Sequence, residues 1–173
     1  MSLFERNKNI KADLIEDKIL KIEVSMLDNV HHISTIYHVL FPEKIIKFAA
    51  ADFKKAPYVE VCKLMSNKMK NIVGLKINHG FTQRIIEILG GESGCHHLVD
   101  HVLEMAKSLA QFIDKSSPLP LPFKEYIEDA PLLRKTILNQ YPKVKNMCWA
   151  YNIENNHLFT KKVKCGLQSE LVI

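Results

Sequence analysis

The sequence predicts an α+β protein in which a three-stranded antiparallel meander is covered by helices. Short β-rich runs separated by turn residues fill residues 17–51. Apolar residues at helical spacing then fill residues 57–114, which form the helical layer. Of the 173 residues 47% are hydrophobic and 25% are charged, as in soluble globular proteins, so this composition excludes an intrinsically disordered chain and a coiled coil.

The three expected strands follow one another through two turns. In residues 19–26 apolar and polar residues partly alternate, and the Asp-Asn pair at 28–29 supplies a turn before the β-rich run of residues 33–39. The Pro-Glu pair at 42–43 ends that run, and residues 44–51 form the third strand. Because so small a sheet is marginal in water, we expect helices to cover one face.

Three helices are expected to form this cover. The first spans residues 57–73, with a proline in its first turn and a glycine after its last residue. A shorter helix spans residues 82–89 and ends at the glycine pair 90–91. The third helix begins at Cys95, because apolar side chains repeat from there at spacings of three and four. Its buried face consists of Cys95, Leu98, Val102, Met105, Leu109 and Phe112.

We expect one domain over residues 1–173, with a helical extension at its C-terminal end. Three prolines make residues 115–123 a stiff, extended connector, because proline disfavours helix and central strand. The extension covers residues 124–173. There Asp129 can cap a helix that ends before Pro142.

The composition also limits location and partners. No apolar stretch reaches the length of a membrane-spanning helix, about 18 to 20 residues, and the N-terminal residues lack the apolar block of a signal peptide. We therefore expect a cytoplasmic protein with no membrane association. The net charge is +5, but the cations are nearly all scattered lysines, without the arginines and aromatic residues that hold bases. This pattern argues against nucleic acid as a partner and leaves a protein partner open.

Residues 90–101, GGESGCHHLVDH, concentrate cysteine and histidine where the third helix is expected to begin. Cys95 would stand at the first helical position, where unpaired N–H groups favour a thiolate. His97 and His101 are four residues apart on one helix face, a spacing that lets two imidazoles bind one metal ion. On an ideal helix Cys95 and His97 point about 200° apart, so they meet only if the first turn is distorted.

These candidates also have structural interpretations without chemistry. Cys95 begins the buried face of its helix, and free cysteine is often buried as a small hydrophobe. His96 and Asp100 could form a surface pair, and His101 could simply be solvated.

Other cysteines and histidines are weaker candidates. Cys62 lies on a methionine-lined helix face and Cys148 lies in an apolar run, so each could be a core thiol or a further ligand. Cys165 is incidental in a lysine-rich tail. The pair at 31–32 is interpreted as a solvated hairpin edge, and His79 could reach the site from the loop before the second helix.

Three stretches of the sequence resemble the bacterial family catalogued as domain of unknown function 2889. They are A-P-Y-x-x-x-C at 56–62, V-G-L-K-I-x-x-G-F-T at 73–82 and L-G-G-x-x-G-C-x-H-L at 89–98. The resemblance covers about residues 15–151 and places the cysteine of the family's C-terminal segment on Cys148. This chain has His96 where members usually carry threonine, and His79 where proline is common. The resemblance implies no activity.

The order of elements also resembles iron–sulfur cluster scaffold proteins, in which a three-stranded meander precedes helices and three cysteines assemble a cluster. In this likeness residues 75–110 stand where those scaffolds place their last cysteine and helix. The chain departs from them after the third strand, where Asp52 and Phe53 stand in place of a glycine-flanked cysteine. The likeness implies an iron–sulfur cluster as an alternative to zinc.

Three functional hypotheses follow. The first is a metal-binding or iron–sulfur accessory protein that holds zinc or an iron–sulfur cluster, with Cys95 and His97 as first ligands and Cys62 and Cys148 as additions. The second is a thiol-dependent enzyme with Cys95 as nucleophile and a histidine as its base. The third is an interaction module without chemistry. Because a helix N-terminus stabilises a thiolate, iodoacetamide is expected to modify Cys95 before Cys62.

Overall fold

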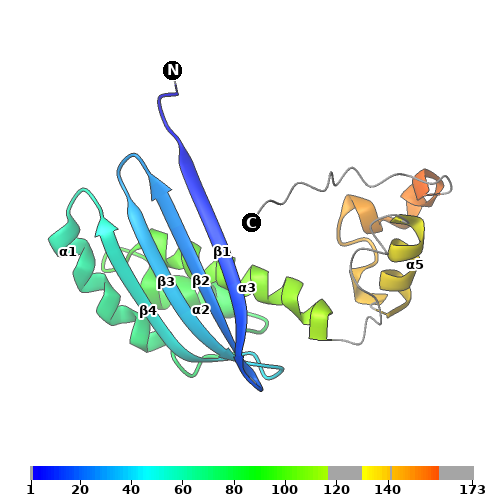
Figure 1. Ribbon diagram of the computed structural model, residues 1–173, viewed down its shortest axis with the longest axis horizontal. Coiled ribbons are helices and arrows are strands. Elements are labelled where there is room, and N and C mark those ends of the chain that lie inside the picture. Colours follow the sequence, from blue (N-terminus) through cyan, green and yellow to red (C-terminus); the bar gives the residue numbers. More distant parts are fainter. Residues whose placement is uncertain (1, 117–129, 141, 160–173) are drawn as a thin grey trace. The chain divides into compact units, whose positions relative to one another are not determined.

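The computed structural model describes residues 2–116, 130–140 and 142–159. The chain divides into two compact units, Met1–Ser117 and Pro118–Ile173. The first unit contains the sheet and the helices that pack on it (Figure 1). No described helix is long and apolar enough to cross a membrane.

The sheet has four antiparallel strands in the order β1-β2-β3-β4. The strands are β1 (Arg6–Glu16), β2 (Ile19–Asp28), β3 (His32–Leu40) and β4 (Ile45–Lys55). The three strands expected from the sequence correspond to β2, β3 and β4, so the expected number of strands was wrong. β1 was missed because it is an edge strand, exposed along most of its length, and its apolar alternation is confined to Ile10, Ala12 and Leu14.

One face of the sheet carries the core. In β2 and β3 alternate residues are buried, and Val24 stands opposite Thr35 and Ile22 opposite Tyr37. This alternation follows from the strand geometry, in which successive side chains point to opposite faces. The pairing of β1 with β2 is regular from Arg6 to Leu14 and shifts before Glu16.

Helices pack on the buried face of the sheet (Figure 1). They are α1 (Val59–Leu64), the 3-10 helix η1 (Met65–Ile72), α2 (Phe81–Leu89) and α3 (His96–Ser116). The single helix expected over residues 57–73 is therefore two segments. Ser66 and Asn67 stand at the change, and both are weak helix formers. The second and third helices are confirmed.

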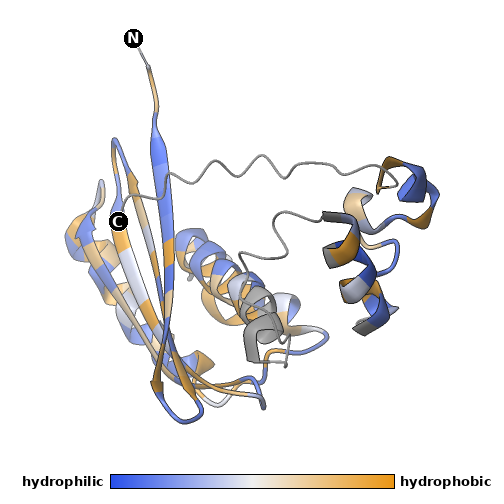
Figure 2. Cartoon of the chain, turned by 45° about the vertical axis from the view of Figure 1, so that its right-hand side comes forward, coloured by the Kyte–Doolittle hydropathy of each residue, from blue (hydrophilic) through white to orange (hydrophobic). Residues whose placement is uncertain are grey.

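The long helix α3 forms a large part of the core. Leu98, Val102, Met105 and Leu109 have no exposed surface, which confirms this part of the predicted buried face. Cys95 is half-buried, and the side chain of Phe112 lies outside the described residues. Figure 2 shows that hydrophilic and hydrophobic residues are mixed along both the helices and the strands. The core joins these side chains to those of the buried sheet face, so the position of α3 on the sheet is set by apolar packing.

The second unit is helical in its described part. It contains α5 (Ala130–Gln140) and the 3-10 helices η2 (Pro142–Val144), η3 (Trp149–Tyr151) and η4 (Ile153–Phe159). Arg134 is buried and joins α5 to the later segments, because its guanidinium donates to the carbonyls of Ala150 and Asn152 and to Asn156 Oδ1. The cap expected at Asp129 and most of the proline connector lie outside the described residues.

Candidate functional site

Backbone contacts that require glycine close the loop between α2 and α3. The amide of Cys95 donates to the carbonyl of Leu89 at 2.6 Å. A Cβ at Gly94 would lie 2.1 Å from the carbonyl oxygen of Gly90, and one at Gly90 would lie 2.6 Å from that of Ile86. The G-G-x-x-G spacing therefore fixes the residue at which α3 begins.

Cys95 stands immediately before α3. Its carbonyl accepts hydrogen bonds from the amides of Leu98 and Val99, so the helix begins one residue later than predicted. The side chain is half-buried and packs against the hydrophobic core. Cys95 thus occupies the helix N-terminus expected for it and also the position expected of a small core thiol.

Three imidazoles meet at the start of α3, and we call them the imidazole cluster: His31, His96 and His97. The ring centroid of His97 lies 4.4 Å from that of His31 and 4.1 Å from that of His96. His31 comes from the β2–β3 connection, so the cluster joins the end of the sheet to the end of the helix. The interpretation of His31 as part of a solvated hairpin edge was wrong, because the residue is half-buried against α3.

A buried carboxylate holds the ring of His31. The side chain of Asp28 has no exposed surface and accepts hydrogen bonds from the amides of Val30 and His31 at 2.8 and 2.6 Å. Arg6 Nε lies 2.8 Å from Asp28 Oδ2, and His31 Nδ1 lies 3.2 Å from Asp28 Oδ1. Burial raises the pKa of this carboxyl, but these hydrogen bonds outweigh it and hold the pKa well below its usual range.

The ionised Asp28 sets the chemistry of His31. A carboxylate only accepts hydrogen bonds, so the proton between the two groups stays on Nδ1 of the imidazole. In the neutral ring Nε2 then carries a lone pair. The spacing Asp28-x-x-His31 within a turn was the sequence signal that could have identified this pair.

The ring of His97 is neutral at pH 7. Burial lowers its pKa to about 4, and the neighbouring His96 and His31 act in the same direction. A neutral imidazole at neutral pH can act as a metal ligand or as a base. His97 can therefore serve as the metal ligand or the base that the sequence predicts.

One turn further along α3, His101 lies in the core. It has no exposed surface, and its Nδ1 is 3.1 Å from Thr35 Oγ1 on β3. Burial lowers its pKa to about 4, followed by the charge of Lys8. The alternative in which His101 is solvated was wrong, because α3 turns this residue towards the sheet.

The expected surface pair of His96 and Asp100 is replaced by other contacts. His96 packs its ring against His97, and Asp100 lies 3.7 Å from Lys8 Nζ on β1. The strand that carries Lys8 was absent from the sequence prediction, so this ion pair could not be foreseen. His79 is exposed in the loop before α2.

The cysteines do not gather in the described part of the chain. Cys62 and Cys95 are both half-buried against the core of the first unit, whereas Cys148 is exposed in the second unit. Within residues 2–116, 130–140 and 142–159, no three His, Cys, Asp or Glu side chains are placed so that they could hold one metal ion. Cys165 lies outside the described residues.

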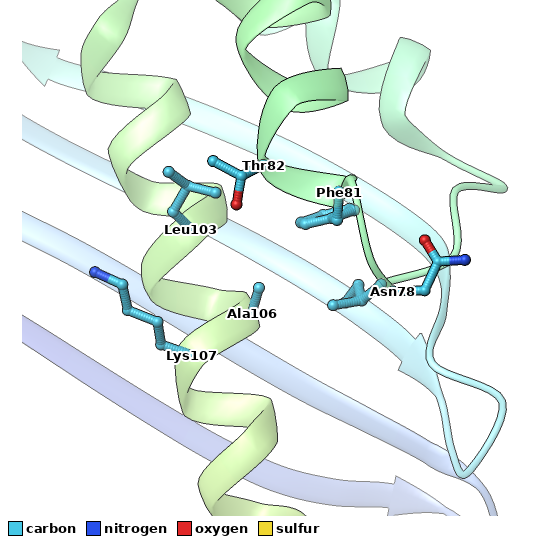
Figure 3. A pocket seen from close by; sticks show the side chains of 7 residues that line it. Asn78, Phe81, Thr82, Leu103, Ala106 and Lys107 are labelled. Atoms are coloured by element: carbon cyan, nitrogen blue, oxygen red, sulfur yellow. The ribbon is translucent and has the colours of Figure 1, made fainter. Parts of the chain in front are cut away.

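An open groove of about 380 Å³ lies between the start of α2 and the middle of α3 (Figure 3). It is lined by Ile77, Asn78, Phe81, Thr82, Leu103, Ala106 and Lys107. The lining is largely apolar and includes none of the imidazole cluster. Lys107 is the one titratable side chain among these lining residues, so the groove offers less chemistry than the start of α3.

The sequence matches the family described as Protein of unknown function (DUF2889) over residues 5–111. That span covers more than half of the chain and nearly all of the first unit. The chain belongs to this family. The DUF2889 match begins before residue 15, where the resemblance was expected to start, and ends well before residue 151, where it was expected to end. Cys148 therefore lies outside the match. No curated protein and no solved structure matches the chain.

Proposed function

We propose that this DUF2889 protein binds a late transition-metal ion, zinc in the first instance, at the imidazole cluster, with His31 and His97 as the first ligands. The observation that carries the proposal is the chain of contacts from Asp28 through His31 to His97. A metal-binding histidine commonly donates its second ring N–H to a carboxylate, which fixes the tautomer and the orientation of the ring. Asp28 is in position to do this for His31.

Binding requires the rings to turn from packing against one another to presenting nitrogen atoms to one point. His96 is exposed and can follow such a turn, while Asp28 keeps its bond to His31 Nδ1. Zinc prefers four ligands, so two or three imidazoles leave at least one position to water or substrate. Such an open site binds more weakly than a closed site of four protein ligands.

The three cysteines that the sequence predicts as metal ligands are further candidates for this site. Cys95 precedes His96 in the chain and is the first thiol to test. Cys62 lies in α1 and Cys148 belongs to the second unit, so both are tested after Cys95. An iron–sulfur cluster would need these thiolates, whereas zinc can bind to imidazoles alone.

The test is a calorimetric titration of the full chain, without an affinity tag, with zinc. We expect one ion per chain, with binding lost in His31→Ala and in His97→Ala. His79→Ala is the matched control, because His79 is an exposed histidine of the same unit, and it should bind as the wild type does. Absence of zinc binding in the wild type contradicts the proposal, as does binding that both cluster variants retain.

Cobalt(II) distinguishes the ligand types. A thiolate ligand adds an intense near-ultraviolet charge-transfer band to the cobalt spectrum, and imidazole and water ligands do not. We expect no such band. A band that Cys95→Ser removes would assign Cys95 as a ligand and contradict an all-imidazole site. Iron and sulfide in stoichiometric amounts after anaerobic purification would replace the zinc proposal with an iron–sulfur cluster.

A further inference from the structure

The outer edge of the sheet at β1 has no strand beside it among the described residues. β1 pairs with β2 on one side and is the terminal strand of the sheet (Figure 1). Apart from Ala12 and Asp13, its residues are exposed. An edge of this kind presents a row of backbone N–H and C=O groups to which another strand can bond.

The opposite edge is protected where β4 begins. The amide of Ile46 donates to the carbonyl of Leu75, and the carbonyl of Ile46 accepts from the amide of Gly74. The segment before α2 thus forms a short bridge to this edge, at Ile45 and Lys76. β1 has no equivalent cover in residues 2–116.

The side chains of β1 are complementary to a second, antiparallel copy of the same strand. When the two-fold axis passes through Ala12, Ile10 of one copy stands opposite Leu14 of the other, and this happens twice by symmetry. In each sheet Ile10 already lies opposite Val24, and Leu14 opposite Leu20, so the apolar row continues across the edge. Leu14 is 65% exposed and Ile10 is 37% exposed in the single chain, and pairing would cover both.

The same register brings opposite charges together on the other face. Lys11 of one copy stands opposite Asp13 of the other, again twice. Within one chain Lys11 is opposite Glu23 and Asp13 is opposite Lys21. The row across two copies therefore reads Lys21, Asp13, Lys11 and Glu23, with alternating sign throughout. Opposite charges on directly paired residues stabilise a sheet, and like charges destabilise it.

Neighbouring registers lack this complementarity. An axis through Lys11 would place the two Lys11 side chains opposite each other. An axis through Ile10 would place Lys11 opposite Asn9, and Asp13 opposite Asn7, so both charged pairs would be lost. The regular part of β1 ends at Leu14, and the pairing around Ala12 lies within it.

We infer that β1 is a homodimer interface, at which two copies of the chain pair antiparallel about Ala12 to form one continuous eight-stranded sheet. The charges on β1 could instead keep strands apart, as lysines do on many sheet edges. That role would be served by charges of one sign. A strand with cations in its first half and anions in its second attracts its own antiparallel copy. This inference is independent of metal binding at the imidazole cluster.

The first experiment measures the mass of the full chain by sedimentation equilibrium over a wide concentration range. We expect a reversible dimer that Leu14→Lys weakens by about tenfold or more, because the lysine would face Ile10 of the partner. Ile86→Lys is the matched control, since Ile86 is a 43% exposed apolar residue on α2, and it should dimerise normally. Unchanged far-ultraviolet circular dichroism checks that both variants fold.

The second experiment tests the register. Lys11→Asp alone and Asp13→Lys alone each create two like-charged pairs and should be largely monomeric. Mixed in equal amounts, the two variants should form a heterodimer. The aspartate introduced in one variant would then face the lysine introduced in the other, and the unchanged Asp13 and Lys11 would still face each other across the edge. Rescue on mixing cannot arise from a folding defect.

The outcomes decide the inference. A chain that stays monomeric at all concentrations overturns it. A dimer that Leu14→Lys leaves intact places the interface on another surface and also overturns it. Loss of the dimer in both charge variants without rescue on mixing rejects the register about Ala12. Loss in Leu14→Lys together with rescue in the mixture supports both the edge and the register.

Discussion

The Nδ1 atom of His101 lies 3.1 Å from the Oγ1 atom of Thr35, in the interior between α3 and the sheet. The Thr35 hydroxyl donates its proton to the carbonyl of Val24, so the imidazole supplies the proton of the bond to Thr35. The Nε2 atom of His101 has no hydrogen-bond partner in the described structure. A second proton on this ring would therefore add an unpaired donor and a charge to the core.

We predict that this histidine makes the first unit sensitive to acid. Its pKa is about 4 in the folded protein and near 6.5 in an unfolded chain, so between these values the unfolded chain binds the extra proton. The stabilising contribution of His101 is fully present above pH 6.5. From pH 7 to pH 5 the free energy of unfolding falls by about 2 kcal/mol on account of His101. Urea unfolding followed by circular dichroism measures this. The single tryptophan, Trp149, is unsuitable because it lies exposed in the second unit.

The control for this prediction is His101→Leu. The substitution replaces the imidazole by an apolar side chain of similar size, and Thr35 keeps its bond to Val24, so stability at pH 7 should change little. The part of the loss between pH 7 and pH 5 that belongs to His101 should disappear, whereas the part due to His97, whose pKa is also lowered to about 4, should remain. His79→Ala should leave the pH dependence as it is in the wild type. An unchanged pH dependence in His101→Leu would show that other groups cause it.

A second prediction concerns the buried carboxylate of Asp28. Asp28→Ala leaves the Arg6 guanidinium and the amides of Val30 and His31 without their acceptor, and we expect a loss of roughly 2 to 4 kcal/mol in the free energy of unfolding. Asp28→Asn retains an oxygen for the two amides and should lose clearly less. Urea midpoints of the two variants at pH 7 give the comparison. Equal losses would mean that the charge, and not the hydrogen bonds to the turn, stabilises this end of the sheet.

The fold could be predicted from the sequence where one face of an element is buried. α3 was predicted because Leu98, Val102, Met105 and Leu109 meet the core at helical spacing. β1 could not be predicted in this way, because its exposed side chains are set by the edge it forms and carry no alternation of burial. Its partner is β2, and without that pairing the short alternation of Ile10, Ala12 and Leu14 was too weak a local signal.

In the candidate site, too, features set by local sequence could be predicted and features set by tertiary contacts could not. The start of α3 was predicted because glycine spacing and cysteine at a helix N-terminus are local features. His31 was set aside because its contact with His97 depends on how the β2–β3 turn meets the helix, which no local spacing records. Likewise, the burial of His101 depends on the orientation of α3 against β3 and was not visible in a repeat of four residues.

A third prediction follows from the close approach at Gly94. A methyl group there would lie 2.1 Å from the carbonyl of Gly90 and 2.2 Å from that of Leu89, and both neighbours are backbone atoms that no side-chain rotation can move. Gly94→Ala should therefore lower the free energy of unfolding by roughly 2 to 4 kcal/mol.

Gly74→Ala is the comparison for Gly94→Ala. Gly74 has a φ of 89° but no atom within 4 Å of an added Cβ, so its substitution costs only the backbone strain, about 1 to 2 kcal/mol. Urea unfolding of both variants should rank Gly94→Ala as the more damaging. The reverse order would mean that the loop before α3 relaxes readily and does not fix the start of the helix.

The last prediction ranks the reactivity of three thiols. Cys148 is exposed and should react with iodoacetamide first. Cys95 and Cys62 are both half-buried, so exposure alone does not separate them. Cys95 precedes the 21-residue helix α3, whose N-terminus stabilises a thiolate, whereas Cys62 lies within the short helix α1. We therefore expect the order Cys148, Cys95, Cys62 in the metal-free protein.

Mass-spectrometric mapping after brief alkylation at neutral pH measures this order. The variant His97→Ala tests whether the imidazole assists, and a slower reaction of Cys95 alone would show that it does. Zinc provides a further comparison: protection of Cys95 by the ion would make it a ligand, and unchanged reactivity agrees with a site made of imidazoles. If Cys62 reacts as fast as Cys95, the helix N-terminus gives Cys95 no advantage and the residue is an ordinary core thiol, so neither a thiolate ligand nor a nucleophile should be sought there.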